Sequence, residues 1–386
     1  MCINERLDKR RTPLLRDELK RHFDTYVDKM TQGERAAAYA SGEEADHIPY
    51  SIQSNEEAMA NVFGYTTAQW RDDPKVHIDV IRRRRDEFGI VGLAAGLRLR
   101  TVGQAVGTRM FFPEVGIDRV VEPAVQTPAD MKRVLDVDPY TSPVYQAILE
   151  RGRILKDAFP EMGIGTSVAG PITVAAMIMP TDLMLRNTRK NPAMVRELLE
   201  LAVYHSVAWA EMFAQEFGGA PCTICDPVSC ADIISRKQYV EFSLPYQQKL
   251  VEGLTKAMGR KPGLHICGKT NTLWDDMRNL DVVSFSVDNR ESLEEAKRRM
   301  GDRFVLVGNV DPVDVMMSGS PADVVEACKN CIRQGSESPL GYNLGTGCQV
   351  PIGTPRENFE AFVYAARIYG AHARKGQLPK GMLEYA

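Results

Sequence analysis

Three residues in this sequence combine side chains that bind zinc with positions that could bring them to one ion. His265 and Cys267 stand two residues apart in Leu264-His265-Ile266-Cys267-Gly268, and Cys348 stands in the later segment Gly345-Thr346-Gly347-Cys348. On an extended strand, residues i and i+2 point to the same side about 7 Å apart along the backbone, so His265 and Cys267 can share one ion. One imidazole and two thiolates fill three corners of a tetrahedral zinc site and leave the fourth for a substrate.

The flanking residues place these candidate ligands at strand ends. Pro262 and Gly263 exclude a helix before His265, and Gly268 ends the extended run. Cys348 follows a short extended stretch and precedes a predicted helix start, in which Thr354 caps, Pro355 takes the first helical position and Glu357 closes a capping box.

Each candidate ligand also has a structural interpretation. Cysteine outside disulfides is among the most buried residue types, and a single histidine on an apolar strand is more often a core residue than a ligand. The glycine-flanked, strand-terminal placement of all three residues favours the metal site.

Composition narrows the class of protein. The chain has 386 residues, 44% hydrophobic and 26% charged, with a formal net charge of −3 and a pI near 6.1. The run Arg82–Arg85 is followed at once by Asp86 and Glu87, which is typical of a solvated helix face. We therefore expect a globular enzyme that does not bind nucleic acid.

The N-terminal segment and the cysteines predict a cytoplasmic location. Residues 4–11 are charged where a targeting signal needs an apolar core, and the longest apolar run, 166–180, is interrupted by Gly170-Pro171 and is too short to span a membrane. Eight cysteines are too sparse for a disulfide framework, so we expect thiols, no membrane contact and a cytoplasmic enzyme.

The apolar pattern predicts an α/β fold. Residues 1–88 read as an N-terminal helical lead-in packed on residues 89–386, which form a single catalytic barrel domain. Seven short apolar runs are candidate parallel strands: 90–93, 164–168, 221–225, 264–266, 282–287, 304–307 and 342–344. Helix starts at Thr127-Pro128, Ser320-Pro321 and Thr354-Pro355 predict helices that connect successive parallel strands.

The architecture expected from these elements is a (β/α)8 TIM barrel. It is preferred to an open sheet because no Gly-rich dinucleotide motif follows any of the runs. In such a barrel His265, Cys267 and Cys348 lie at the catalytic rim.

These motifs together resemble a known family. Residues 265–268, Gly308-Asn309-Val310-Asp311-Pro312, residues 347–348 with 354–358, and 226–235 with Leu244-Pro245-Tyr246 look like the uroporphyrinogen decarboxylase superfamily, and within it the zinc-dependent methylcobamide:coenzyme M methyltransferases. The similarity covers roughly residues 160–370. It implies a (β/α)8 barrel, one catalytic Zn²⁺, and methyl exchange between a corrinoid (cobalamin) carried by a partner protein and a small substrate.

The decarboxylase branch of the superfamily fits less well. It carries an arginine-rich N-terminal motif for tetrapyrrole carboxylates, and nothing comparable stands near residues 47–50. The sequence favours a zinc-activated thiol, or another methyl donor or acceptor, reacting with the corrinoid. A metal-free decarboxylase and a non-catalytic barrel that docks a corrinoid protein remain the alternatives.

Further residues are candidates for supporting roles. Asp226, Asp288 and Asn309 each end a strand-like run and could bind the cofactor, and Asp226 could also ligate the zinc or hold a substrate. Turn or cap formation would explain these residues equally well. Cys222 and Cys225 form a C-x2-C pair without a second pair at zinc-ribbon spacing. The remaining candidates are interpreted as packing residues, with a corrin-lining role open for the two methionines: Cys328, Cys331, Met177 and Met179.

Overall fold

The computed structural model describes residues 15–53 and 56–384. The charged segment at residues 4–11, from which the absence of a targeting signal was predicted, lies outside the described residues. The chain divides into two compact units. Unit 1 comprises residues 1–66, 79–91 and 286–386, and unit 2 comprises residues 67–78 and 92–285.

Eight parallel strands form the central sheet, in the order β2-β11-β10-β9-β8-β7-β6-β3. Their bounds are β2 (Tyr50–Ser51), β3 (Leu93–Ala94), β6 (Ile164–Ala169), β7 (Cys222–Cys225), β8 (Gly263–His265), β9 (Ser284–Ser286), β10 (Val305–Val310) and β11 (Tyr342–Thr346). The boundary between the two units falls within β9. Parallel strands that alternate with helices make this the (β/α)8 fold that the sequence predicts.

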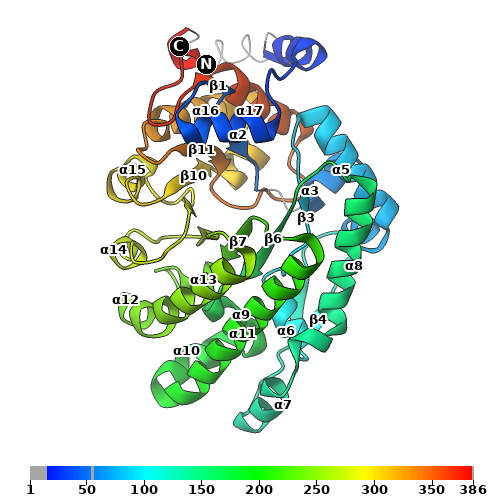
Figure 1. Cartoon of the computed structure of the whole chain (residues 1–386), viewed down its shortest axis with the longest axis vertical. Helices are drawn as coiled ribbons and strands as arrows, with labels where there is room; N and C mark the ends of the chain where they lie inside the picture. Colours follow the sequence, from blue (N-terminus) through cyan, green and yellow to red (C-terminus); the bar gives the residue numbers. More distant parts are fainter. Residues whose placement is uncertain (1–14, 54–55, 385–386) are drawn as a thin grey trace, which may run out of the picture. The chain divides into compact units, whose positions relative to one another are not determined.

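Unit 2 supplies the strands and helices around the predicted histidine ligand. Its helices are α4 (Thr67–Asp72), α6 (Thr101–Ala105), α7 (Met131–Leu135), α8 (Pro143–Ala158), α9 (Pro171–Ile178), α10 (Thr181–Lys190), α11 (Pro192–Phe217), α12 (Arg236–Gln238), α13 (Leu244–Met258) and α14 (Trp274–Met277). The long helix α11 packs on α13 and α9 (Figure 1). A separate antiparallel pair joins β4 (Arg109–Phe111) to β5 (Arg119–Glu122).

Strand β6 of unit 2 has one buried face and one more open face. On β6, Ile164, Thr166 and Val168 are buried, whereas Gly165 and Ser167 between them are partly exposed. Thr166 accepts a hydrogen bond from the indole N–H of the buried Trp209 on α11, at 2.9 Å. Burying one face of a strand against helices fixes its register, because a slip by one residue would turn the apolar side chains outward.

Unit 1 holds the remaining strands and a second set of helices. They are α2 (Gln32–Ser41), α3 (Glu56–Val62), α15 (Leu293–Met300), α16 (Pro321–Gly335), α17 (Arg356–Ile368) and α18 (Gly381–Glu384), with residues 15–25 also helical. Helix α5 (Pro74–Phe88) begins in unit 2 and ends in unit 1. In the core of unit 1, the ring of Phe88 lies 6.1 Å from that of Phe63 and 6.2 Å from that of Phe359.

The central sheet has a strand at each of the seven predicted runs, although β3 overlaps the run 90–93 only at Leu93, and it contains one further strand that was not predicted. It is β2, which pairs with β11 through Tyr50 and Ser51. A second short strand, β1 (Ala45–His47), pairs with β12 (Ala371–Ala373), so the first 88 residues are not helical throughout. Two or three residues beside Pro49 are too few to show strand periodicity in the sequence.

The helix starts confirm two predicted caps and correct a third. Ser320 caps α16 with a full capping box, and Thr127 does so for a short 3₁₀ turn at Pro128–Asp130. Thr354 does not cap α17, because that helix begins at Arg356 and the Thr354 hydroxyl donates instead to the carbonyl of Pro351 at 2.9 Å. The N-cap position of α17 is Pro355, so Thr354 lies one residue too early to cap the helix.

Candidate functional site

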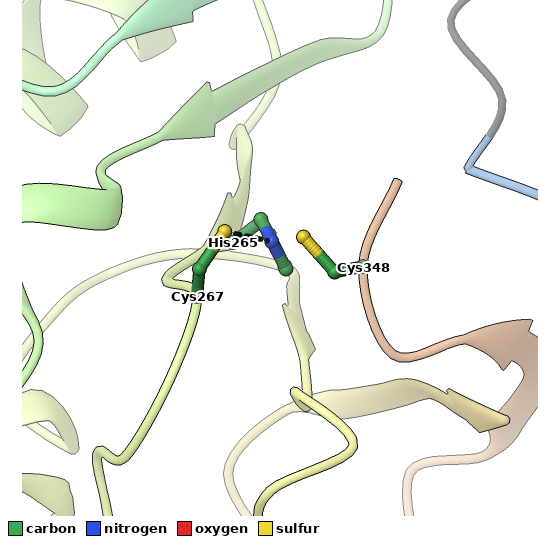
Figure 2. A group of neighbouring side chains, drawn as sticks. All are labelled: His265, Cys267 and Cys348. Atoms are coloured by element: carbon green, nitrogen blue, oxygen red, sulfur yellow. Dashed lines mark hydrogen bonds between the residues drawn. The ribbon is translucent and has the colours of Figure 1, made fainter. Parts of the chain in front are cut away.

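The end of β8 places the predicted histidine and the first predicted cysteine together. His265 is the last residue of the strand and is 5% exposed, while Cys267 is half-buried. Figure 2 shows their side chains pointing toward each other, and His265 Nε2 lies 3.0 Å from Cys267 Sγ. This contact places the two side chains on the same side of the segment, as the sequence predicts, and Ile266 between them is fully buried.

This pair suits a single metal ion. Two ligands on one tetrahedral zinc, with a Zn–N distance of about 2.0 Å and a Zn–S distance of about 2.3 Å, lie about 3.6 Å apart. The observed 3.0 Å contact between His265 and Cys267 therefore needs only a small rotation of either side chain. Nitrogen and sulfur ligands of this kind select zinc over magnesium or calcium.

Cys348 lies at the corresponding end of a strand in unit 1. Strand β11 ends at Thr346, and the half-buried Cys348 follows two residues later. The intervening Gly347 donates its N–H to the carbonyl of Val310 at 2.8 Å. A side chain at Gly347 would lie 2.3 Å from the backbone nitrogen of Asn289, so only glycine fits at this close approach.

A loop of unit 2 holds the backbone on both sides of Cys267. We call residues 226–232 the supporting loop. Asp226 donates its N–H to the carbonyl of His265 at 2.9 Å, and Ala231 donates to the carbonyl of Lys269 at 2.8 Å. In return, the Lys269 N–H donates to the carboxylate of Asp232 at 3.1 Å. These contacts fix the ends of the segment that carries the two candidate ligands.

Asp226 lies at the end of β7, as the sequence predicts, but its carboxylate is enclosed by the protein. One oxygen accepts from the N–H and the hydroxyl of Thr173 at 3.1 and 2.6 Å, and the other accepts from Ser229 at 2.6 Å and Gln247 at 2.8 Å. Burial raises the pKa of the Asp226 carboxyl above its ordinary value, and these hydrogen bonds oppose the rise. The sequence did not predict these partners. Thr173 on α9 and Gln247 on α13 lie more than 20 residues from Asp226, and Ser229 lies in a turn without a recognisable motif. Gly170-Pro171, at the start of α9, marks the helix start but not the contact.

Asp288 and Asn309 lie together in unit 1. Asp288 is 4% exposed and accepts a hydrogen bond from the N–H of Arg290 at 2.9 Å. The Asn309 amide donates to the carbonyls of Asp288 and Glu291 at 3.1 and 2.9 Å. These contacts form and hold a turn after β9, and a role of either residue in cofactor binding remains a prediction.

Among residues 15–53 and 56–384, most of the other cysteines are buried packing residues, and Cys225 is the exception. Burial raises the pKa of Cys222 to about 12 and that of Cys331 to about 11, and Cys328 is fully buried. Cys222 and Cys225 lie three residues apart on β7, so their side chains point to opposite faces and cannot chelate one ion. Cys225 is half-buried and is the register partner of His265.

The two methionines considered as lining for a corrin ring lie at the end of α9. Met179 is fully buried, which fits the core interpretation, and Met177 is half-buried.

A second group of acidic and histidine side chains lies within unit 1. Asp28, Asp46 and His47 have ligand atoms within 4.8 Å of one another. Arg35 already pairs with Asp46 at 2.6 Å and with Asp28 at 3.1 Å, and Arg367 pairs with Asp28 at 2.6 Å. Because two guanidinium groups neutralise the two carboxylates, we interpret this group as a structural ion-pair network rather than a metal site.

This network predicts a loss of stability in acid. Burial alone would raise the pKa of Asp28, but the hydrogen bond from His47 and the charge of Arg367 outweigh it and bring the pKa to about 2, from 3.8. The stabilisation is therefore present above pH 3.8 and is lost as the pH falls toward 2. Urea unfolding at several pH values should show this loss, and Asp28→Asn should remove the part of the slope between these two values. An unchanged slope in the variant would contradict the assignment.

None of the helices in the described part of the chain combines the length and the apolar character needed to cross a membrane.

Comparisons with known proteins place this geometry in context. The chain is 26% identical over 349 residues to a methylated-thiol–coenzyme M methyltransferase from Methanosarcina mazei, covering 88% of this chain and 90% of that protein. It is 31% identical over 223 residues to the methylcobamide:CoM methyltransferase MtbA from Methanosarcina acetivorans, covering 58% of this chain and 63% of that protein. It is also 29% identical over 276 residues to a uroporphyrinogen decarboxylase from Methylobacillus flagellatus, covering 69% and 75%.

A solved structure supports the fold. It is described as a methyltransferase from Methanosarcina mazei and superposes with a TM-score of 0.71 at 23% identity, covering 88% of this chain and 98% of that chain. The model of one family, uroporphyrinogen decarboxylase (URO-D), matches residues 31–369. Because this match extends over most of the sequence, the chain belongs to the uroporphyrinogen decarboxylase family.

Proposed function

We propose that this protein is a zinc-dependent methyltransferase that moves a methyl group between a methyl-corrinoid protein and a small substrate such as a thiol. His265, Cys267 and Cys348 are the proposed zinc ligands, and all three are drawn in Figure 2. The contact between His265 and Cys267 is the observation that carries the proposal, because it brings a nitrogen and a sulfur ligand together at a strand end. The methyltransferase names of the relatives support the reaction class.

The donor set suits activation of a thiol. Two thiolates and a neutral imidazole balance the charge of Zn²⁺, which when bound lowers the pKa of a substrate thiol and leaves its sulfur electron-rich. His265 is 5% exposed, so the protein shields this side of the site from bulk water. In the thiol direction, the sulfur–carbon bond forms as the carbon–cobalt bond of the methyl-corrinoid breaks, and both electrons of that bond remain on the cobalt.

The other candidate residues take supporting roles in this proposal. Asp288 is the candidate for contact with the cofactor or the substrate, because it follows strand β9 of the central sheet by two residues. Asn309 acts through the turn after β9, since its amide is bonded to the backbone of Asp288 and Glu291. Asp226 is fully buried, so its supporting role is exerted through the residues it contacts.

A metal-free decarboxylase is the second candidate, because several relatives are named uroporphyrinogen decarboxylase. The two functions differ in their dependence on zinc. Removing zinc with a chelator should abolish methyl transfer, whereas a decarboxylase of that kind would retain its full rate.

A spectroscopic assay tests the proposal. The purified protein is mixed with methylcobalamin, or with cob(I)alamin, and a panel of thiols and methyl donors that includes 2-mercaptoethanesulfonate, and cobalt absorbance is followed. We expect one panel member to change the cobalt spectrum, and we expect the change to stop after chelation and return with Zn²⁺. A protein that binds zinc but changes no spectrum, even with a corrinoid protein as carrier, would contradict the proposal and favour a non-catalytic docking role.

A further inference from the structure

The supporting loop contacts the proposed zinc-ligand segment through backbone hydrogen bonds and through side chains. The hydrogen bonds from Asp226 to His265 and from Ala231 to Lys269 enclose the stretch that carries both ligands of unit 2. The side chains of the loop meet the segment as well, since a side chain added at Gly268 would lie 3.0 Å from a carboxylate oxygen of Asp232 and 3.4 Å from the sulfur of Cys230. The position of the loop therefore determines where His265 and Cys267 stand.

The Asp226 carboxylate determines the position of the loop. It is fully buried, and it accepts hydrogen bonds from Ser229 within the loop and from two further elements, through Thr173 in the first turn of α9 and Gln247 in α13. The Thr173 hydroxyl also accepts from the N–H of Val228, which ties the loop to α9 a second time.

The Asp226 side chain requires glycine at position 170. A side chain at Gly170, the residue before α9, would lie 2.0 Å from the carboxyl carbon of Asp226, so the carboxylate occupies the space where a side chain would be. The four donors are neutral, and the N-terminus of the eight-residue helix α9 adds a favourable dipole. A buried anion held by four donors cannot bind a metal without losing them, which excludes Asp226 as a ligand in this arrangement.

We propose that Asp226 is a positioning residue for the zinc site, which it serves by anchoring the supporting loop and, through its own backbone, the carbonyl of His265. This inference rests on the proposed function. Residues that contact the metal ligands without binding the metal commonly set the orientation of the ligands, and their loss lowers metal affinity about 10- to 100-fold.

Asp226→Asn is the informative substitution. The amide has the shape of the carboxylate, but its NH2 group must face either the two donors of Thr173 or the donors of Ser229 and Gln247. One side of the cluster is then left without its acceptor. A second comparison uses Thr173. Thr173→Val removes the hydroxyl donor and should have a smaller effect than Asp226→Asn, and Thr173→Ser keeps the hydroxyl.

Thr166→Val is the matched control. It also removes a buried acceptor in unit 2, the partner of the Trp209 indole, but it touches neither the supporting loop nor residues 263–269. A loss of stability alone would affect the control and Asp226→Asn alike, whereas a positioning role affects only the substitutions at Asp226 and Thr173.

Two measurements on the full-length protein test the inference. Zinc affinity is measured by competition with a chromophoric chelator, and hydrogen exchange of the zinc-free protein is measured for peptides that cover 226–232 and 263–269. We expect Asp226→Asn to weaken zinc binding about 10- to 100-fold and to speed exchange in both peptides, Thr173→Val to do so less, and Thr173→Ser and Thr166→Val to resemble the wild type.

The outcomes separate this inference from the proposed function. If the wild type binds zinc tightly and Asp226→Asn and Thr173→Val match it in affinity and exchange, the positioning role is wrong and the zinc proposal stands. If the wild type binds no zinc, the proposed function fails. In that event, faster exchange confined to the two peptides would still show that Asp226 anchors the loop, and unchanged exchange would refute that too.

Discussion

Replacing Cys348 with serine should lower both the affinity for zinc and the rate of methyl transfer by more than about 100-fold. Loss of a ligand lowers metal affinity more than loss of a residue that only orients a ligand. Serine keeps the size of the side chain, but its hydroxyl stays protonated at neutral pH and offers zinc no anionic sulfur. Cys348 is half-buried at the end of β11, so the change leaves the core intact. Bound zinc is counted after gel filtration, and methyl transfer is followed by cobalt absorbance.

Cys225→Ser provides the matched control for Cys348→Ser. Cys225 is also a half-buried thiol at a strand end, and it is the register partner of His265, but it is not among the proposed ligands. We expect this variant to keep its zinc. If Cys225→Ser lost the metal while Cys348→Ser retained it, the ligand assignment would be wrong and the site would lie within unit 2.

Replacing Arg35 with methionine should lower the free energy of unfolding by about 3–5 kcal/mol, the range measured when one partner of a buried ion pair is removed. Arg35 is 7% exposed, and its guanidinium bonds to both oxygens of Asp46 at 2.6 and 2.9 Å and to Asp28 at 3.1 Å. Methionine keeps the length of the side chain but leaves the Asp46 carboxylate, 3% exposed, without its cation. Urea unfolding followed by circular dichroism gives the free energy.

The exposed pair of Arg186 and Asp182 serves as the control for this change. Both side chains are about two-thirds exposed, and Arg186→Met should change the free energy of unfolding by no more than about 1 kcal/mol. An equal effect at both sites would show that burial of the network is unimportant. Stabilisation of the wild type by added divalent metal would instead favour a metal site at Asp28, Asp46 and His47.

The strands were predictable from sequence where apolar runs were long enough. Residues 164–168 and 304–307 form strands β6 and β10, because each run buries one face against helices and is punctuated by small or polar residues. Strand β2 was missed because its two residues, Tyr50 and Ser51, gain their strand geometry only by pairing with β11. A contact between segments almost 300 residues apart leaves no local pattern.

The candidate site shows the same limit at the level of single residues. Alternation predicted correctly that His265 and Cys267 lie on one side of their segment, since only local geometry is involved. The position of Asp226 at a strand end was equally local and correct. The enclosure of its carboxylate by Thr173 and Gln247 depends on the packing of α9 and α13, which the sequence pattern does not encode.

Thr354 illustrates why a local motif can mislead. Its spacing to Pro355 and Glu357 matches a capping box, yet the hydroxyl bonds to the carbonyl of Pro351 in the preceding turn. Capping needs the hydroxyl oxygen to accept an N–H bond at the N-cap position, and Pro355 holds that position because α17 begins at Arg356. The helix begins one residue later than predicted, which leaves the position of Cys348 before it unaffected.

X-ray absorption at the zinc edge of the purified protein, combined with metal analysis, tests the zinc site most directly. We predict one zinc per chain, with two sulfur neighbours at about 2.3 Å and one imidazole nitrogen at about 2.0 Å. A zinc shell without sulfur, or a metal-free protein that transfers methyl groups at its full rate, would contradict the assignment of His265, Cys267 and Cys348.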